Sequence, residues 1–286
     1  MIPALLEACR PLNVLMAVLA VLVGALLAQA DALAHGAAWL AAGGTALALA
    51  AGNLWNDLAD LAEDRINRPG RPLPSGRLSM GAARRAAAGA SLGALALALA
   101  IAWEALLLVA ACLALLGWYA RQGKQAGLAG NMAVASLAAA SVGFGALSQV
   151  WAGLGARPEA ALVPALLAGL LHLARELAKD AEDVAGDRQA GRRTWVLAAG
   201  PVALQRLLAQ VAVLALLPPL LALLLGPPDP VLRAAHLIAL AVAPLLLRQV
   251  LRGGLAKRDR AARLSAFCKQ LLVAGLLVYA VAAILR

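Results

Sequence analysis

Apolar runs long enough to cross a membrane recur from one end of this chain to the other. A transmembrane helix needs about 20 predominantly apolar residues, and in lipid only helices and closed barrels satisfy every backbone polar group. The strict alternation of a barrel strand is absent, so the runs predict helices. Because 63% of the 286 residues are hydrophobic, more than the surface of a soluble protein accommodates, we expect an all-α polytopic membrane protein.

Nine apolar segments are the expected spans. They lie near residues 13–33, 37–57, 86–102, 104–120, 130–152, 160–179, 203–225, 231–250 and 267–285. The third and fourth segments are poorly separated, so a count of eight is the alternative. The first segment ends in small residues, as a signal peptide does, but the membrane pattern that follows favours a retained span. One domain over residues 1–286 is expected.

Basic residues are distributed unevenly between alternate loops. Of the 25 Lys and Arg, 22 lie before the first expected span or beside the loops that follow the even-numbered spans. Such loops stay in the cytoplasm. We therefore expect a protein of the cell (inner) membrane with its amino terminus in the cytoplasm and its carboxyl terminus outside. The net charge of +10 is then a signature of orientation and phosphate binding, and no nucleic-acid partner is expected.

Two acidic clusters close the second and sixth expected spans. Both have four-residue spacing: Asn56, Asp60 and Asp64 in the first, and Arg175, Lys179, Asp183 and Asp187 in the second. Residues four apart share one face of a helix. Nine of the 15 acidic residues lie in these clusters, and both clusters fall on the predicted cytoplasmic side. Carboxylates beside membrane helices are costly without a cation, so a metal site is expected.

Corresponding positions of the two clusters are 123 residues apart. This offset relates Asp60 to Asp183 and Asp64 to Asp187. Because an offset of four spans preserves orientation, halves of about 1–125 and 126–286 would be parallel repeats that face one cavity.

Carboxylates on two facing helices suit Mg²⁺, which prefers oxygen ligands and completes its coordination with water and phosphate oxygens. The Arg and Lys side chains nearby would bind the same phosphates. A diphosphate site above an apolar cavity indicates an isoprenyl diphosphate as substrate. Neutralising the departing diphosphate favours cleavage of the allylic C–O bond and leaves a carbocation for a nucleophile to capture.

The two clusters resemble, in order, the two motifs of the UbiA superfamily of intramembrane prenyltransferases. The first motif covers residues 56–69 and continues through 71–77, and the second covers residues 175–187. Arg10-Pro11-x-Asn13, and the stretch from Tyr119 through Asn131, are similar to further family features. The similarity extends to about residue 200, and the last three spans add little beyond hydrophobicity.

The resemblance implies nine helices around a central cavity, with two Mg²⁺ ions between the motifs and the diphosphate. Asn56, Asp60 and Asp64 would hold one ion, and Asp183 and Asp187 the other. Lys179 would contact the diphosphate. The remaining residues expected to bind substrate are Arg65, Tyr119, Lys124, Arg175 and Arg188.

The acceptor is the part that the motifs indicate least directly. Arg175 stands where a common family pattern has Tyr, and the residues from 65 to 69 and from 175 to 180 are most similar to the branch that alkylates a glycerol-phosphate ether lipid. An aromatic acceptor, such as 4-hydroxybenzoate or a quinone precursor, is the alternative within the superfamily.

Two other classes of protein are weaker alternatives. A CDP-alcohol phosphotransferase would carry its acids in one compact motif, whereas these clusters are far apart in the chain. A divalent-cation transporter would need acids deep in the membrane, and mid-span acids are nearly absent. Neither the prenyl chain length nor the oligomeric state is indicated by the sequence.

Overall fold

The computed structural model describes residues 2–123, 126–189, 194–227 and 229–286. Within these residues every regular element is a helix, which confirms the all-α prediction. The elements in chain order are α1 (Ile2–Ala8), α2 (Pro11–Ala28), η1 (Ala32–Ala34), α3 (Gly36–Ala59), α4 (Leu61–Asn67), α5 (Met80–Leu99), α6 (Trp103–Trp118), η2 (Tyr119–Gly123), α7 (Leu128–Trp151), η3 (Pro158–Ala161), α8 (Leu162–Gln189), α9 (Trp195–Leu214), α10 (Leu217–Leu225), α11 (Pro230–Ala239), α12 (Val242–Leu251) and α13 (Arg258–Ile284).

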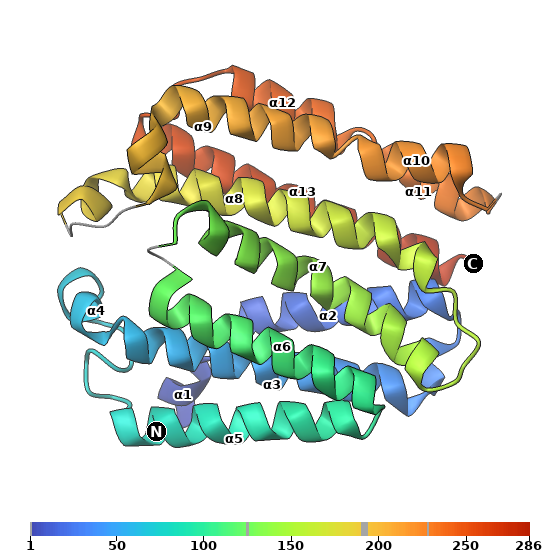
Figure 1. Cartoon of the computed structure of the whole chain (residues 1–286), viewed down its shortest axis with the longest axis horizontal. Coiled ribbons are helices and arrows are strands. Elements are labelled where there is room, and N and C mark those ends of the chain that lie inside the picture. Colours follow the sequence, from blue (N-terminus) through green and yellow to red (C-terminus); the bar gives the residue numbers. More distant parts are fainter. Residues whose placement is uncertain (1, 124–125, 190–193, 228) are drawn as a thin grey trace.

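Eight helical stretches of the described chain are long and apolar enough to cross a membrane. The third expected span, 86–102, is the one outside this set; it corresponds to α5, which is 20 residues long and runs along the bundle beside α3 and α6 (Figure 1). Arg84, Arg85 and many small residues leave α5 without a stretch as apolar as those of the other eight. The expected nine helices are therefore eight strongly apolar stretches together with α5.

The seventh and eighth expected spans each consist of two helices. The first breaks between α9 and α10 at residues 215–216, and the second breaks between α11 and α12 at residues 240–241. Prolines lie just after both breaks, at positions 218, 219 and 244, where a missing amide donor is tolerated in a first turn. The last helix begins at Arg258, earlier than the expected residue 267, because its charged first turns carry no hydropathy signal.

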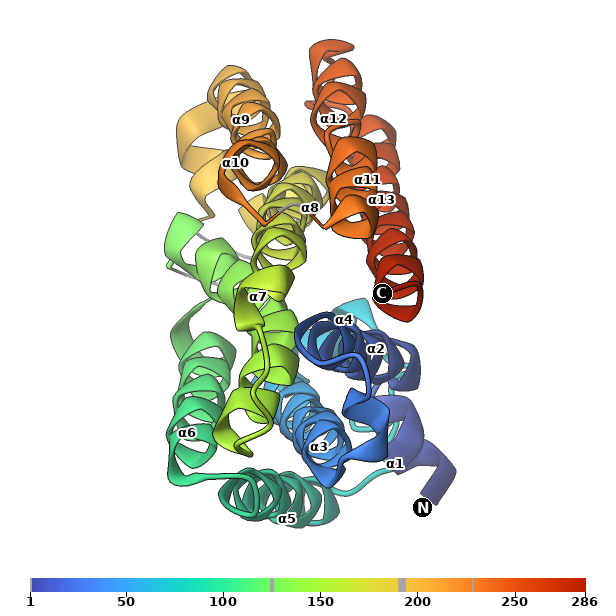
Figure 2. The same ribbon diagram turned by 90° about the vertical axis from the view of Figure 1, so that its right-hand side faces the viewer.

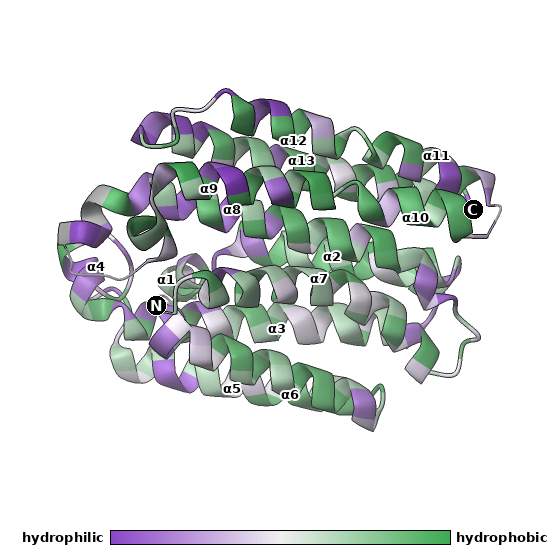
Figure 3. Cartoon of the chain, turned by 45° about the horizontal axis from the view of Figure 1, so that its top comes forward, coloured by the Kyte–Doolittle hydropathy of each residue, from purple (hydrophilic) through white to green (hydrophobic). Residues whose placement is uncertain are grey.

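The helices form one bundle whose motif-bearing ends lie together. Viewed along the helices, α1–α6 gather on one side and α9–α13 on the other, with α7 and α8 between them (Figure 2). Figure 1 shows that α4 and the carboxyl end of α8 lie at the same end of the bundle. Hydrophilic residues concentrate at that end and in the opposite loops, while hydrophobic residues cover the lengths of the helices (Figure 3). This is the distribution that a bilayer requires.

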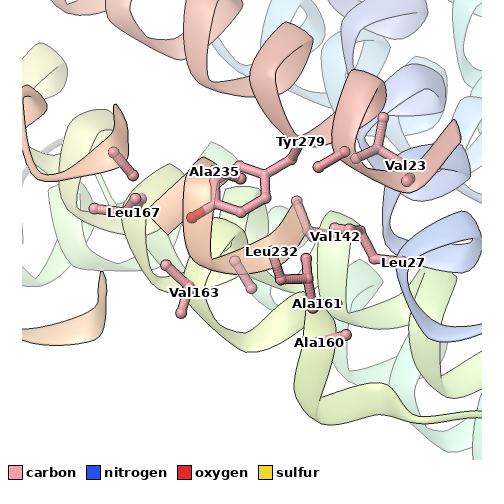
Figure 4. Packing of buried hydrophobic residues seen from close by; sticks show 14 of the residues in the cluster. Val23, Leu27, Val142, Ala160, Ala161, Val163, Leu167, Leu232, Ala235 and Tyr279 are labelled. Carbon is pink, nitrogen blue, oxygen red and sulfur yellow. The ribbon is translucent and has the colours of Figure 1, made fainter. Parts of the chain in front are cut away.

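A buried hydrophobic cluster packs α2, α7, α8, α11 and α13 together away from the motifs (Figure 4). Val23 of α2, Val142 of α7, Val163 of α8 and Leu232 of α11 belong to this cluster. Tyr279 of α13 lies among them, and its hydroxyl is hydrogen-bonded to Nδ1 of His236 at 3.0 Å. This buried pair joins α11 to α13.

Backbone contact between α2 and α7 depends on two glycines. A Cβ added to Gly24 would lie 2.0 Å from the carbonyl oxygen of Val142, and one added to Gly145 would lie 1.8 Å from the carbonyl oxygen of Val21. Small residues allow membrane helices to approach this closely. The contact fixes α7 against the helix that follows Arg10.

Gly145→Ala is expected to destabilise the protein by about 2 kcal/mol, because overpacking a close contact has a cost of that order. The measurement is the unfolding free energy in detergent. Gly143→Ala is the matched control on the same helix, since an added Cβ there meets nothing within 4 Å. Alanine is the better helix former, so the control should be neutral or slightly stabilising. Equal stability of the two variants would contradict the contact.

Candidate active site

The bundle encloses a cavity of about 980 Å³. Its lining residues on α8 extend from Pro164 to Asp187, a length of about 35 Å at 1.5 Å per residue. This length is comparable to the hydrocarbon thickness of a bilayer, about 30 Å. Both acidic motifs line the end near α4, whereas side chains such as Leu167 and Leu276 line the rest. The cavity therefore joins a polar end to a long apolar interior.

The first motif lies where α3 meets α4. Asp60, with φ −86° and ψ 2°, separates the two helices. The amide of Asp60 still donates to the carbonyl of Asn56 at 2.9 Å, and the amide of Asp64 donates to that of Asp60 at 2.8 Å. The four-residue spacing thus survives the break, and all three side chains line the cavity.

The side chain of Asn56 is oriented by its neighbour. Its Nδ2 donates to Oδ2 of Asp60 at 2.9 Å, and its buried Oδ1 has no hydrogen-bond partner in the described structure. A buried oxygen without a partner is destabilising, so this amide oxygen is suited to coordinate a metal ion or to accept a hydrogen bond from a ligand.

The second motif lies on one uninterrupted helix, α8. Asp183 and Asp187 line the cavity together with Arg175 and Lys179. Glu176 is buried and accepts from Nη1 of Arg175 at 2.5 Å and from Nζ of Lys179 at 3.3 Å. One carboxylate therefore binds both cations at the cavity wall, an arrangement that the four-residue pattern does not reveal.

A network of ion pairs supports the first motif. Asp57 is 4% exposed; it accepts from Nη2 of Arg10 at 2.6 Å and lies 3.6 Å from Nη1 of Arg71. The same Nη1 donates to Oδ2 of Asp64 at 2.6 Å. Arg10 has φ 55°, a conformation uncommon for a residue with a side chain, and its guanidinium also donates to Asn53 at 3.3 Å. These contacts hold the strained backbone in place.

Two further polar residues line the cavity near the motifs. Asn131 of α7 donates to Oδ2 of Asp180 on α8 at 2.8 Å, which fixes the two helices at the polar end. Tyr119 begins η2, a π-helical turn, and also lines the cavity. Single π-helical turns frequently occur at functional sites.

Eight of the 11 residues expected at the site line the cavity: Asn56, Asp60, Asp64, Tyr119, Arg175, Lys179, Asp183 and Asp187. Arg65 and Arg188 are exposed and do not line it. Lys124 lies outside the described residues. Their predicted contacts with the diphosphate stay predictions.

Several cationic side chains that line the cavity are not among the site residues predicted from the sequence. Arg68 and Arg71 come from the loop that follows α4, and Arg258 and Lys269 come from α13. The loop has an arginine every few residues, and only its folded conformation selects among them. The α13 cations lie far beyond both motifs, so no local pattern connects them to the site.

The donor set of the polar end fits Mg²⁺. The unpartnered Asn56 oxygen and the carboxylates of Asp60, Asp183 and Asp187 are the oxygen donors that this ion prefers. Across the described ranges, no three His, Cys, Asp or Glu side chains are grouped closely enough to hold an ion. Magnesium commonly takes one or two carboxylates and fills its remaining positions with water and phosphate oxygens, so substrate phosphate would complete such a site.

The chain is similar to known proteins over most of its length. It matches the UbiA prenyltransferase family over residues 17–281. Digeranylgeranylglyceryl phosphate synthase of Methanopyrus kandleri is 40% identical over 218 residues, which cover 76% of this chain and 78% of the relative. The synthase of the same name from Halobacterium salinarum is 40% identical over 209 residues, 73% of this chain and 72% of the relative.

Solved structures share the same architecture. One from work on the biosynthesis of digeranylgeranylglyceryl phosphate synthase in membranes matches with a TM-score of 0.72 at 25% identity, covering 100% of this chain and 99% of the other. A UbiA homolog from Archaeoglobus fulgidus, bound to GPP and Mg²⁺, matches with a TM-score of 0.72 at 16% identity, over 99% of this chain and all of the other. The second match concerns the fold alone. From the extent of the family match, the chain belongs to the UbiA prenyltransferase family.

Proposed function

We propose that this protein transfers a prenyl group from an isoprenyl diphosphate to a glycerol-phosphate ether lipid, geranylgeranylglyceryl phosphate. Membership of the family makes the chain an intramembrane prenyltransferase. The acceptor is supported by relatives from two organisms that share about 40% identity over most of their length. The observation that carries the proposal is one cavity with both acidic motifs at one end and an aliphatic interior.

The polar end would bind the diphosphate. Glu176 holds Arg175 and Lys179 at the cavity wall, where their charges attract phosphate oxygens. We propose two Mg²⁺ ions, one held by Asn56, Asp60 and Asp64 and the other by Asp183 and Asp187. When bound, Mg²⁺ would neutralise the charge that develops on the departing diphosphate.

The apolar interior would bind the isoprenoid chain. Leu108, Leu167 and Leu276, from three different helices, line it. When the allylic C–O bond breaks, its electron pair leaves with the diphosphate and the prenyl C1 becomes cationic. An acceptor hydroxyl oxygen then bonds to C1, and its proton passes to the departing diphosphate. Aliphatic walls exclude the water that would otherwise capture the cation.

Purified protein with Mg²⁺ should convert geranylgeranyl diphosphate and geranylgeranylglyceryl phosphate into a doubly alkylated lipid, identified by mass spectrometry. Pyrophosphate should be released in equal amount, and a chelator should stop the reaction. A prenylated 4-hydroxybenzoate as the preferred product would contradict the proposed acceptor. Mg²⁺ flux into liposomes without pyrophosphate release would contradict the transferase.

Asp60→Asn and Asp183→Asn are each expected to lower kcat by about 100-fold, the usual order of loss for a group that stabilises developing charge. Both variants should unfold at the wild-type temperature. Asp259→Asn is the matched control, because Asp259 is exposed on α13 and does not line the cavity. Full turnover by Asp60→Asn or Asp183→Asn would contradict the assignment of that carboxylate to the active site.

Asp57→Asn should behave differently, because Asp57 is part of the support for the site. The change removes the charge that Arg10 and Arg71 share. Loss of a buried pair is destabilising, but the Arg10 side chain is 32% exposed, so about 1–2 kcal/mol is expected. The measurement is the unfolding free energy beside that of Asp60→Asn. A stability equal to that of Asp60→Asn would contradict the supporting role.

We also propose that the polar end faces the cytoplasm, which rests on the uneven distribution of Lys and Arg. In protein lacking its three cysteines, a cysteine introduced at exposed Arg65 should react with an impermeant maleimide only in inside-out vesicles. One introduced at exposed Arg157 should react only from the outer face. The reverse pattern would overturn this orientation.

A further inference from the structure

One histidine lies in the cavity wall where its charged and apolar parts meet. His172 of α8 lines the cavity, and so does Arg175, one turn closer to the acidic motifs. At 1.5 Å per residue, the two positions are about 5 Å apart along the helix. The residues of α8 that line the cavity before His172 are all apolar: Pro164, Leu167, Ala168 and Leu171. His172 is therefore the last polar side chain of α8 before the apolar interior.

A hydrogen bond to the backbone fixes which ring nitrogen of His172 carries the hydrogen. Nδ1 lies 3.1 Å from the carbonyl oxygen of Ala168. Because a carbonyl oxygen only accepts, Nδ1 is the donor, and in the neutral ring Nε2 then has a free lone pair. Within the described residues Nε2 has no hydrogen-bond partner, and it is not among the enclosed atoms that lack one. A lone pair at the cavity wall is thus available to a ligand.

The other bases near this level of the cavity already have partners or lie elsewhere. Glu176 accepts from two cationic side chains, and Asp180 accepts from an amide of α7. The chain has three histidines, and the other two, His35 and His236, do not line the cavity. His172 is therefore the histidine suited to meet a substrate inside it.

We infer that Nε2 of His172 binds the hydroxyl of the acceptor and takes its proton during prenyl transfer. The inference rests on the proposed function, which places the diphosphate at the charged end and the prenyl chain in the apolar interior. The prenyl C1 joins these two parts of the substrate, so it would lie near the boundary that His172 marks.

The proposed step moves one proton through the ring. The acceptor hydroxyl donates a hydrogen bond to Nε2, which leaves a lone pair of its oxygen free for C1. As the O–C1 bond forms, the electron pair of the O–H bond stays with the oxygen and the proton passes to Nε2. The imidazolium then gives the proton to the departing diphosphate, and the ring returns to its neutral form.

The test compares His172→Leu with His172→Gln in steady-state assays with geranylgeranyl diphosphate and geranylgeranylglyceryl phosphate. Both variants should lower kcat about 100-fold, the lower end of what a positioned general base contributes. His172→Leu should also raise KM for the acceptor about fivefold, since it removes one hydrogen bond. His172→Gln keeps an accepting oxygen that cannot take the proton, so its KM should stay near the wild-type value.

Binding of a non-hydrolysable geranylgeranyl diphosphate analogue separates this role from a structural one. Both variants should bind the analogue with the wild-type Kd in the presence of Mg²⁺, because His172 is assigned to the acceptor. His35→Gln is the matched control, since His35 does not line the cavity, and it should keep the wild-type kcat.

Two results would overturn the inference. Wild-type kcat in His172→Gln or in His172→Leu would show that the ring takes no proton. Weaker binding of the analogue, in parallel with the loss of kcat, would assign His172 to support of the diphosphate site. Failure of the proposed function is distinguishable, because it would appear in the wild-type protein as absence of the doubly alkylated lipid.

Discussion

Carboxylates at the end of an apolar helix bundle need positive charge or hydrogen-bond donors nearby, and this requirement organises the polar end of the molecule. Asp57 is paired with Arg10 and Arg71, and Glu176 is paired with Arg175 and Lys179. The network around Asp57 supports the first motif, and Glu176 places two cations at the cavity wall. The side-chain oxygens of Asn56 and Asp60 lie at the same polar end, where they would bind a metal ion whose coordination substrate phosphate completes.

The scaffold brings two distant segments to one cavity through helix packing. Glycines allow α2 and α7 to touch through their backbones, and Asn131 links α7 to α8. The hydrogen-bonded pair of His236 and Tyr279 joins two helices near the opposite, hydrophobic end. A rigid frame of this kind matters for catalysis because a bound diphosphate and a carbocation must be held in fixed geometry away from water.

Much of the fold and of the site was predictable because it depends on periodicity. Apolar runs predicted the spans, and four-residue spacing predicted that Asn56, Asp60 and Asp64 share a face. The breaks between α9 and α10 and between α11 and α12 were not predicted, because hydropathy reads each pair as one run. The site partners Arg71 and Glu176 were missed as well, because loop conformation and side-chain pairing depend on contacts that spacing does not encode. The predicted internal duplication stays a prediction.

The central claim is that both acidic motifs bind metal together with one diphosphate. The most direct measurement is anomalous diffraction from crystals grown with Mn²⁺ and a non-hydrolysable isoprenyl diphosphate analogue. We expect anomalous peaks inside the cavity, between the Asp60 side chain and the carboxylates of Asp183 and Asp187, with the analogue's phosphates between the motifs. Peaks confined to one motif, or phosphates bound away from both, would contradict it.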